Sequence, residues 1–450
     1  METERHPVSP AETGGATGSA APTGSVAKSG TGAKATFATV LRNPRYLLLW
    51  LAQLISDLGD AFAAIAALIL VTDFTRSAVA ISALMFLQLV PMVVAGPIIG
   101  VFVDRWDRKK ILIASDVVRG LLWLALALHP TLAALYPAVF VSTLASLFFR
   151  PARGAIIPEL VGDEQMQAAV GLAQSTTQFT GLLGPIVGGA LVGFFGTGAV
   201  FGINAASFLA SALVIVFIAI PEAARFPKGR QAKGTSGAET AAATGPRSSF
   251  RSELGTGLRF IRSDVVLWFL IVLFGCFGLV AQLAGVAAID YLRNTIALSP
   301  GRFGLVMTAE GLGAVLGAVI AGNLAGRLRS GPTAAWGFVA LLGLFGLFFL
   351  HPGFAVLPLL FGLIGMLETG FNVPLTSVFY RRTPPEVRGR VFSVANSLMN
   401  GLGLGTLPLA GFVVAWLGSA ATLGWVGVIG VATMLLGLTT RGGKAFLRER

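Results

Sequence analysis

Long apolar runs separated by short polar turns make up most of the chain between residues 45 and 440. Each run is close to or above the roughly 20 residues that an α-helix needs to cross a bilayer. We expect membrane spans at residues 46–72, 77–102, 110–128, 131–149, 165–194, 198–220, 265–292, 301–326, 333–350, 354–380, 390–416 and 420–439. The pattern therefore predicts an all-α integral membrane protein with twelve transmembrane helices.

Two polar segments divide this pattern. Residues 1–44 are rich in Gly, Ala, Thr, Ser and Pro without apolar periodicity, which is typical of a disordered tail. Residues 221–263 separate the first six spans from the last six, and Phe250–Arg262 within them has the pattern of a helix lying on the membrane surface. We expect a disordered tail at 1–44, a six-helix bundle at 45–220, a linker with a surface helix at 221–263, a second six-helix bundle at 264–440 and a tail at 441–450.

The basic residues gather in alternate turns. Lys and Arg cluster near residues 105–110, 150–153, 225–262, 327–329 and 381–390 and in both tails. The opposite turns hold only Arg76, Arg293 and Arg302. Because cytoplasmic loops of membrane proteins carry such an excess, we expect both termini and the linker on the cytoplasmic side of a bacterial inner membrane.

Composition narrows the class of function. Of the 450 residues, 54% are hydrophobic and only 12% are charged, whereas a soluble domain has about 25% charged residues. The net charge of +12 lies in short turns, so we expect no nucleic-acid partner. The single cysteine, Cys276, allows no intramolecular disulfide. The sequence has no Walker loop and no His/Cys cluster with metal-ligand spacing, so we expect no ATP-driven transport, no enzymatic activity, no metal and no cofactor.

The stretch Gly96–Lys110, GPIIGVFVDRWDRKK, joins two apolar runs through a tight basic turn. Gly96 and Gly100 are four residues apart, so they share one helix face and would let another helix approach closely. The order Gly-x3-Asp-Arg-x2-Arg-Lys resembles the signature loop between helices 2 and 3 of the major facilitator superfamily. The residues of this gating loop are Gly96, Gly100, Asp104, Arg105, Arg108 and Lys109.

Asp104 has a separate predicted role in that loop. Its carboxylate would suit the positive N-terminus of the helix that starts near Arg388–Val391. Such a contact would hold the two halves together on the cytoplasmic side and would break as the halves move. The simpler interpretation is that Arg105, Arg108 and the two lysines only anchor the turn at the cytoplasmic surface, and both roles are compatible.

Three further stretches carry the resemblance over residues 45–440. They are Gln53–Asp60 in helix 1, Phe149–Arg153 after helix 4, and the loop before helix 11 with Glu386, Arg388, Gly389 and Arg390. Together they resemble the bacterial drug and siderophore exporters of that superfamily, such as macrolide-efflux and enterobactin-exporter-like proteins. The resemblance implies two six-helix bundles that transport by alternating access.

Helix 5 resembles the antiporter motif of drug exporters, Gly-x8-Gly-x3-Gly-Pro-x2-Gly-Gly. The matching residues are Gly171, Gly184, Pro185, Gly188 and Gly189. Thr180 replaces the middle glycine, which weakens the inference of antiport without removing it.

The two halves of the chain also resemble each other. Three short motifs recur at offsets of 222, 227 and 223 residues: Gly100–Arg105 in Gly322–Arg327, Pro158–Leu160 in Pro385–Val387, and Pro185–Gly188 in Pro408–Gly411. A nearly constant offset indicates a duplication with parallel halves. Gly326 stands where Asp104 stands in the first copy, so only the first copy is expected to act fully as a gate.

Charges at membrane depth are costly and mark transport pathways by default. Asp57 and Asp60 are three residues apart in helix 1, so they lie on one face, and two carboxylates this close resist double ionisation. We expect them to form a proton or cation site, the alternative being structural carboxylates near a water-filled vestibule. Asp116 and Arg119 in helix 3 have the spacing of a local ion pair, although Arg119 could also reach the carboxylates of helix 1.

Glu310 in helix 8 and Glu368 in helix 10 each lie about ten residues from a helix end, so about 15 Å deep. Neither has another charge close in sequence. A role facing the transport cavity and a structural hydrogen bond to a neighbouring helix are equally compatible with this placement.

The sequence therefore predicts a secondary transporter that exports a hydrophobic or amphipathic small molecule in exchange for protons. We expect it to work as a monomer in the lipid bilayer. An uptake symporter of the same fold is the first alternative. A membrane sensor or assembly protein that transports nothing is the second, but it would need a large soluble domain or the loss of the intramembrane charges.

Overall fold

A computed structural model describes residues 36–103, 105–225, 250–324 and 327–449, and these residues contain helices but no strand. The helices are α1 (Phe37–Leu41), α2 (Pro44–Thr75), α3 (Ala78–Val103), α4 (Arg108–Leu128), α5 (Leu132–Val161), α6 (Asp163–Phe217), α7 (Glu222–Arg225), α8 (Phe250–Ser263), α9 (Val265–Asp290), η1 (Tyr291–Thr295), α10 (Pro300–Leu324), α11 (Ser330–Gly346), η2 (Leu347–Leu350), α12 (Leu357–Arg382), α13 (Pro385–Leu417), α14 (Ser419–Thr439) and α15 (Arg441–Phe446).

The helix α6 accounts for two membrane crossings. Eleven described helices are long and apolar enough to span a membrane, but α6 has 55 residues, about 80 Å at 1.5 Å per residue. It is interrupted at Gly196, where φ is 78° and ψ is 169°, a conformation that a residue without a Cβ adopts easily. The break lies between the predicted spans 165–194 and 198–220. The prediction of twelve transmembrane helices is thereby confirmed.

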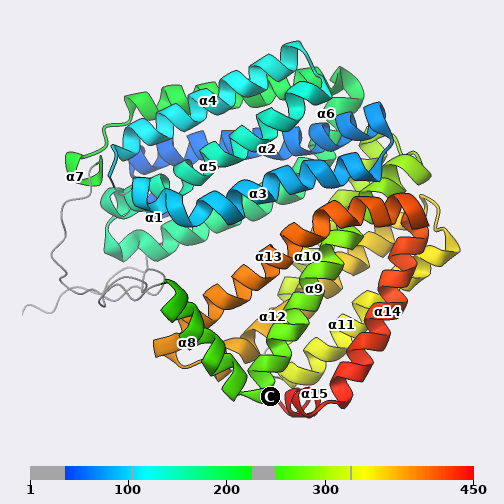
Figure 1. Ribbon diagram of the computed structural model, residues 1–450. Coiled ribbons are helices and arrows are strands. Elements are labelled where there is room, and N and C mark those ends of the chain that lie inside the picture. Colours follow the sequence, from blue (N-terminus) through cyan, green and yellow to red (C-terminus); the bar gives the residue numbers. More distant parts are fainter. Residues whose placement is uncertain (1–35, 104, 226–249, 325–326, 450) are drawn as a thin grey trace, which may run out of the picture.

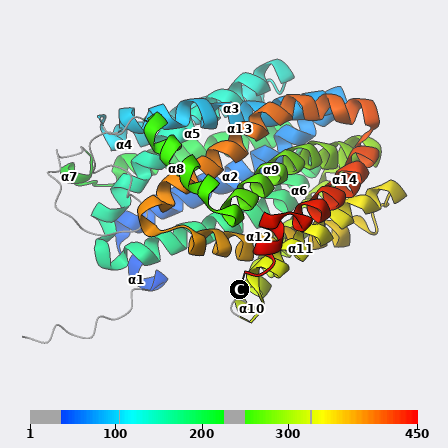
Figure 2. The same cartoon turned by 60° about the horizontal axis from the view of Figure 1, so that its bottom comes forward.

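The spanning helices form two bundles, as the sequence predicted (Figure 1). In the first bundle, α2 and α4 pack on α6, and α3 and α4 pack on α5. In the second, α10 and α11 pack on α12, α9 packs on α13, and α14 packs on α11. A helix is present at the expected residues as α8, which lies beside α13 in both views (Figures 1 and 2), and its position on the membrane surface stays a prediction.

The bundles touch through α6 with α10 and through α3 with α13. A Cβ on Gly304 of α10 would lie 2.2 Å from the carbonyl oxygen of Pro185, and one on Gly411 of α13 would lie 2.3 Å from Ser82 Oγ. Arg293 adds a hydrogen bond to Thr72 Oγ1 at 3.2 Å and an ion pair with Asp73. Arg293, Thr72 and Asp73 lie at the helix ends away from the basic turns. In Figure 1 the ribbons converge at this end and diverge toward α1, α7 and α8.

Two sequence-based boundaries are wrong. Residues 37–41, placed in the disordered tail, form α1, because Val40 is fully buried in an apolar cluster. The fourth span continues beyond Phe149 to Val161 despite Pro151 and Pro158. Buried residues recur along it at helical spacing: Phe149, Ala152, Ile156 and Leu160.

The C-terminal segment also packs on the second bundle. Helix α15 contributes the fully buried Phe446, whose ring lies 5.5 Å from that of Phe269 in α9. The N–H of Gly331 donates to the carbonyl of Glu449 at 3.2 Å. Part of the linker and most of the N-terminal tail lie outside the described residues, so the full set of domain boundaries stays a prediction.

Candidate functional site

A charge cluster, buried except at Asp60, joins helices α2 and α4. Arg119 of α4 forms an ion pair with Asp116 one turn earlier, and its Nη1 lies 3.8 Å from Asp60 Oδ2 of α2. Asp116 is fully buried and Arg119 is 4% exposed. The sequence analysis gave two interpretations of Arg119, a local ion pair and a bridge to the first predicted span, which is α2. Both are confirmed.

Helix α6 completes this cluster with polar groups that the sequence analysis missed. Asn204 Nδ2 donates to Asp60 Oδ1 at 3.3 Å, and Ser211 Oγ donates to Asp116 Oδ2 at 2.6 Å. Asn204 and Ser211 are seven residues apart, so they share a helix face inside an apolar run. That spacing is the sequence signal that could have revealed them.

Aromatic rings hold the guanidinium of Arg119 in place. It lies 4.1 Å from the ring centroid of Phe208 and 4.9 Å from that of Phe149. A cation over an aromatic face is attracted by the ring quadrupole. Arg119 is thus fixed by the rings and by Asp116 whether or not Asp60 is charged.

The close approach of α2 and α6 depends on Gly59, which precedes Asp60. A Cβ at residue 59 would lie 2.4 Å from Ser207 Oγ and 2.6 Å from Asn204 Oδ1. Any larger residue would push Asn204 away from Asp60. The glycine therefore positions the amide that bonds the carboxylate.

The two carboxylates of the cluster differ in access. The side chain of Asp60 is 44% exposed, whereas that of Asp116 is fully buried. With both ionised, the cluster of Asp60, Asp116 and Arg119 carries a net charge of −1. A proton added to Asp60 would neutralise the cluster and leave Arg119 paired with Asp116, so no buried charge would lose its partner.

Asp57 shares a helix face with Asp60 but has other partners. Gln53 Nε2 donates to Asp57 Oδ1 at 2.5 Å, and the charge of Asp57 interacts with Arg153 and Arg150 of α5. Asp57 and Arg153 line the same small cavity. Asp57 and Asp60 also interact with each other, as predicted for neighbouring carboxylates.

The second bundle holds the other predicted pair of carboxylates. Glu310 of α10 and Glu368 of α12 are brought near each other, so that their charges interact. A Cβ on Gly365 would lie 2.1 Å from the carbonyl oxygen of Glu310, which shows how closely the two helices cross. Within the described residues, neither carboxylate forms an ion pair or a side-chain hydrogen bond, and neither contacts Asp57 or Asp60.

The gating loop is tied to its own bundle. Asp107 caps the N-terminus of α4 by accepting from the N–H of Lys109 at 2.9 Å and of Lys110 at 3.3 Å, and it pairs with Arg225 of α7. Lys109 Nζ donates to the carbonyls of Val216 and Ile218 at the end of α6, both at 2.8 Å. Asp107 and Lys109 therefore bind the turn to helices α4, α6 and α7.

The remaining described residues of the gating loop lie in α3, in α4 or in the turn between them. Arg105 is exposed, and Arg108 is the first residue of α4. Among the described residues, no atom lies within 4 Å of the place of a Cβ on Gly96, so the close helix approach predicted at Gly96 is absent in this conformation. Gly100 lies in α3. Asp104 lies outside the described residues, and its predicted contact with helix 11 stays a prediction.

Asp107→Asn is expected to make the stability of the protein less dependent on pH. Burial opposes ionisation of Asp107, but hydrogen bonds from Arg225 and from the N–H groups of Lys109 and Lys110 outweigh it and lower the pKa of this carboxyl. A lowered pKa stabilises the fold above the unfolded value of about 3.9 and loses this effect as the pH falls below it. The melting temperature of the purified wild type should therefore drop more between about pH 5 and pH 3 than that of the variant.

The matched control for this prediction is Asp107→Ala. Asn keeps a cap acceptor, whereas Ala removes it at a cost of about 1 kcal/mol. The alanine variant should melt lower than the asparagine variant at pH values where the wild type is most stable. Equal pH slopes for the wild type and Asp107→Asn would contradict the assignment.

The loop before helix 11 starts α13. Arg388 donates to the carbonyl of Thr383 from Nε at 3.3 Å and from Nη2 at 3.2 Å, and its guanidinium lies 5.5 Å from the ring of Tyr380. Arg390 is exposed, and a Cβ on Gly389 would meet nothing within 4 Å in the described part of the chain. Glu386 lies in the first turn of α13, and the position of its side chain is outside the description.

The glycines of the helix 5 motif lie in α6 and face three other helices, α1, α2 and α10. Gly171 faces Phe37 of α1 at 3.3 Å from the place of a Cβ. Gly184 and Gly188 face Ala61 and Phe62 of α2 at 2.6 and 3.1 Å.

The end of the motif crosses between the bundles. A Cβ on Gly189 would lie 2.5 Å from the carbonyl oxygen of Pro300, and the carbonyl of Pro185 faces Gly304. The motif thus joins α6 to α2 and also to α10 of the other bundle. Thr180, which replaces the middle glycine, is buried and donates to the carbonyl of Thr177 at 3.0 Å.

Comparison with known proteins agrees with this architecture. Residues 49–288 match the model of the Major Facilitator Superfamily. The MFS-type transporter YfiS of Bacillus subtilis is 29% identical over 91% of this chain and 96% of its own length. Macrolide efflux protein A of Streptococcus pyogenes is 24% identical, covering 79% of this chain and 86% of its own, and enterobactin exporter EntS of Escherichia coli is 23% identical, covering 88% and 92%.

Solved structures with the same fold include a bacterial homologue of the iron transporter ferroportin in the inward-facing state. It has a TM-score of 0.67 at 17% identity and covers 91% of this chain and all of its own. The nucleoside transporter NupG has a TM-score of 0.66 at 13% identity, with 90% of this chain and 99% of its own covered.

Proposed function

The chain belongs to the Major Facilitator Superfamily, and from this premise we propose that it exports a hydrophobic or amphipathic small molecule in exchange for protons. It is a multi-pass membrane transporter, and its relatives include exporters. The proposal adds proton coupling, the class of substrate and the direction.

One observation carries the proton coupling: the cluster of Asp60, Asp116 and Arg119. It holds one more carboxylate than guanidinium, and the extra carboxylate, Asp60, is the exposed one. Ionisable groups inside a membrane are kept where they serve an ion or proton pathway. A carboxylate that can take a proton without stranding a buried cation suits reversible proton exchange.

The direction and the substrate class are supported by two different features. Relatives include a macrolide efflux protein and an enterobactin exporter, so export of a small molecule is the function their names share. The helix 5 motif lies at the contact between α6 and α10, where the bundles must separate in the opposite state. Export by antiport is therefore favoured over the uptake symporter.

The conformation fits one stage of alternating access. The bundles touch at the end away from the basic turns, through α6 with α10 and α3 with α13. If the basic turns face the cytoplasm, as the positive-inside rule predicts, this state receives substrate from the cytoplasm. Release on the other side would require the contacts at Gly189, Gly304 and Gly411 to open.

Inverted membrane vesicles with an imposed proton gradient test the proposal. A panel of macrolides, siderophores and lipophilic cations is offered outside vesicles with an acidic lumen. Antiport is expected to accumulate at least one compound inside, with accumulation abolished by a protonophore and absent from vesicles without the protein. If the acidic lumen instead drives a preloaded compound out, the chain is an uptake symporter and the proposed direction is wrong.

A further inference from the structure

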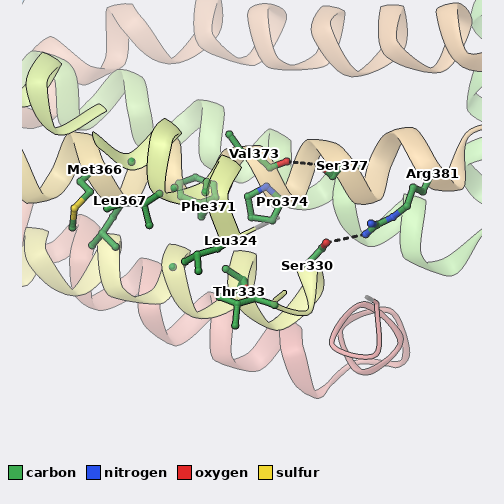
Figure 3. A pocket seen from close by; sticks show the side chains of 16 residues that line it. Leu324, Ser330, Thr333, Met366, Leu367, Phe371, Val373, Pro374, Ser377 and Arg381 are labelled. Atoms are coloured by element: carbon green, nitrogen blue, oxygen red, sulfur yellow. Dashed lines mark hydrogen bonds between the residues drawn. The ribbon is translucent and has the colours of Figure 1, made fainter. Parts of the chain in front are cut away.

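A pocket of about 230 Å³ lies between α10, α11 and α12 of the second bundle (Figure 3). At one end, the pocket is closed by a tight crossing of α10 and α12. There, Cβ atoms on Gly313 and Gly317 would lie 1.9 and 2.2 Å from the carbonyl oxygens of Gly362 and Met366. Beyond the crossing, the helices leave a space that the first half of α11 covers. The pocket therefore lies in the half of the bundle next to the basic turns.

The wall of this pocket is mostly apolar. Met366, Leu367 and Phe371 line its inner part. Among the other lining residues, Ile320 is 46% exposed and Leu328 is 48% exposed, so the pocket is open at the surface of the bundle. A mostly apolar pocket that is open at the surface of a membrane-spanning bundle suits an alkyl chain.

The mouth of the pocket carries positive charge. Arg381 lines it and donates to Ser330 Oγ at 2.9 Å, as Figure 3 shows. Arg327 and Arg329 are exposed in the turn that connects α10 to α11. Glu449, which lies beside Gly331 at this end of the bundle, pairs with Arg382. The mouth therefore suits an anion at the level of the membrane surface.

Helix α12 leaves free space inside the pocket next to Gly370. Pro374 has no N–H, so it provides no helical donor for the carbonyl of Gly370, and both residues line the pocket. A Cβ on Gly370 would meet nothing within 4 Å in the described part of the chain. A larger side chain at residue 370 can therefore enter the pocket without displacing the backbone.

We propose that this pocket binds an anionic phospholipid of the adjacent leaflet, with one acyl chain between α10 and α12 and the phosphate at Arg381 and Ser330. The volume is below the roughly 300–1,000 Å³ typical of sites for drug-sized molecules, so it suits a single chain better than a transported macrolide. Basic residues near the surface of a membrane attract anionic lipids. The site is separate from the charge cluster of Asp60 and does not depend on proton coupling.

Native mass spectrometry of the delipidated full-length protein tests the proposal by titration with phosphatidylglycerol and phosphatidylcholine. Arg381→Gln should weaken phosphatidylglycerol binding about fivefold, as expected for the loss of one arginine at the surface. Gly370→Leu should abolish the tightest binding event, because the side chain takes the place of the acyl chain. The matched controls Arg441→Gln, at the same end of the bundle, and Gly343→Leu, on the outside of α11, should bind as the wild type does.

Three results would overturn the site. If phosphatidylcholine bound as tightly as phosphatidylglycerol, the mouth of the pocket would not select an anionic headgroup. Undiminished binding by Gly370→Leu, with a melting temperature like that of Gly343→Leu, would exclude the pocket as the place of the chain. If glycerol 3-phosphate, which has no acyl chain, displaced phosphatidylglycerol completely, the site would bind only an anion at the surface and no acyl chain.

Discussion

Asp60→Asn is expected to reduce proton-driven transport to the level of vesicles without the protein, while exchange of substrate down its gradient continues. The amide resembles the protonated carboxyl, so the cluster with Asp116 and Arg119 stays permanently neutral. Asn204 can still bond the side chain at residue 60, and Arg119 keeps its partner Asp116. The variant therefore keeps the fold and loses only the change of charge. The measurement is transport in inverted vesicles with and without a proton gradient.

Two other variants separate the coupling role from a structural one. Asp57→Asn removes a carboxylate that interacts with Arg153 and lies outside the ion pairs of Arg119, so it should shift the pH dependence of transport without abolishing it. Asp116→Asn takes away the fully buried partner of Arg119 and leaves it only Asp60 at 3.8 Å, so this variant should lower the melting temperature.

One set of results would exclude the cluster as the proton site. If Asp57→Asn, Asp60→Asn and the double variant all keep proton-driven transport with unchanged pH dependence, the proton site lies elsewhere. Glu310 and Glu368 would then be the next carboxylates to neutralise, since they form the other interacting pair at membrane depth.

The membrane spans could be predicted from the sequence because hydrophobic length is a local property. A run of about 20 apolar residues has few alternatives to a spanning helix. Even the break in α6 falls between two predicted spans, in a glycine-rich interval around Gly196. The end of the fourth span was not, because Pro151 and Pro158 suggest a break that tertiary packing of Ala152 and Ile156 overrides.

The partners inside the site could be predicted only in part. Spacing placed Asp57 with Asp60 and Asp116 with Arg119, since these pairs lie on single helices. The contacts of Asn204 with Asp60 and of Ser211 with Asp116 depend on how α6 is rotated against α2 and α4, which no local pattern reports. The proximity of Glu310 and Glu368 likewise follows from the glycine crossing of α10 and α12.

Gly189→Ala is expected to slow transport strongly by disfavouring the present conformation. Its Cβ would lie 2.5 Å from the carbonyl oxygen of Pro300, so α6 and α10 would have to move apart. Overpacking of a close contact costs about 1–3 kcal/mol. The cost arises only where α6 touches α10, so the equilibrium should shift away from this state by a factor of about 5–150.

The matched control is Gly193→Ala, one turn further along the same helix. A Cβ on Gly193 would meet nothing within 4 Å among the described residues, and both substitutions raise helix propensity equally. Gly304→Ala makes the corresponding test from the other bundle, because its Cβ would lie 2.2 Å from the carbonyl oxygen of Pro185.

Spin-label distances across the closed end measure the shift. With Cys276 replaced by Ser, labels at Phe74 of α2 and Trp416 of α13 lie on exposed positions of opposite bundles. Gly189→Ala should move the distance distribution toward longer values, and transport should fall in proportion to the lost population. A distribution and a transport rate equal to those of Gly193→Ala would mean that the contact between α6 and α10 does not control which end is closed.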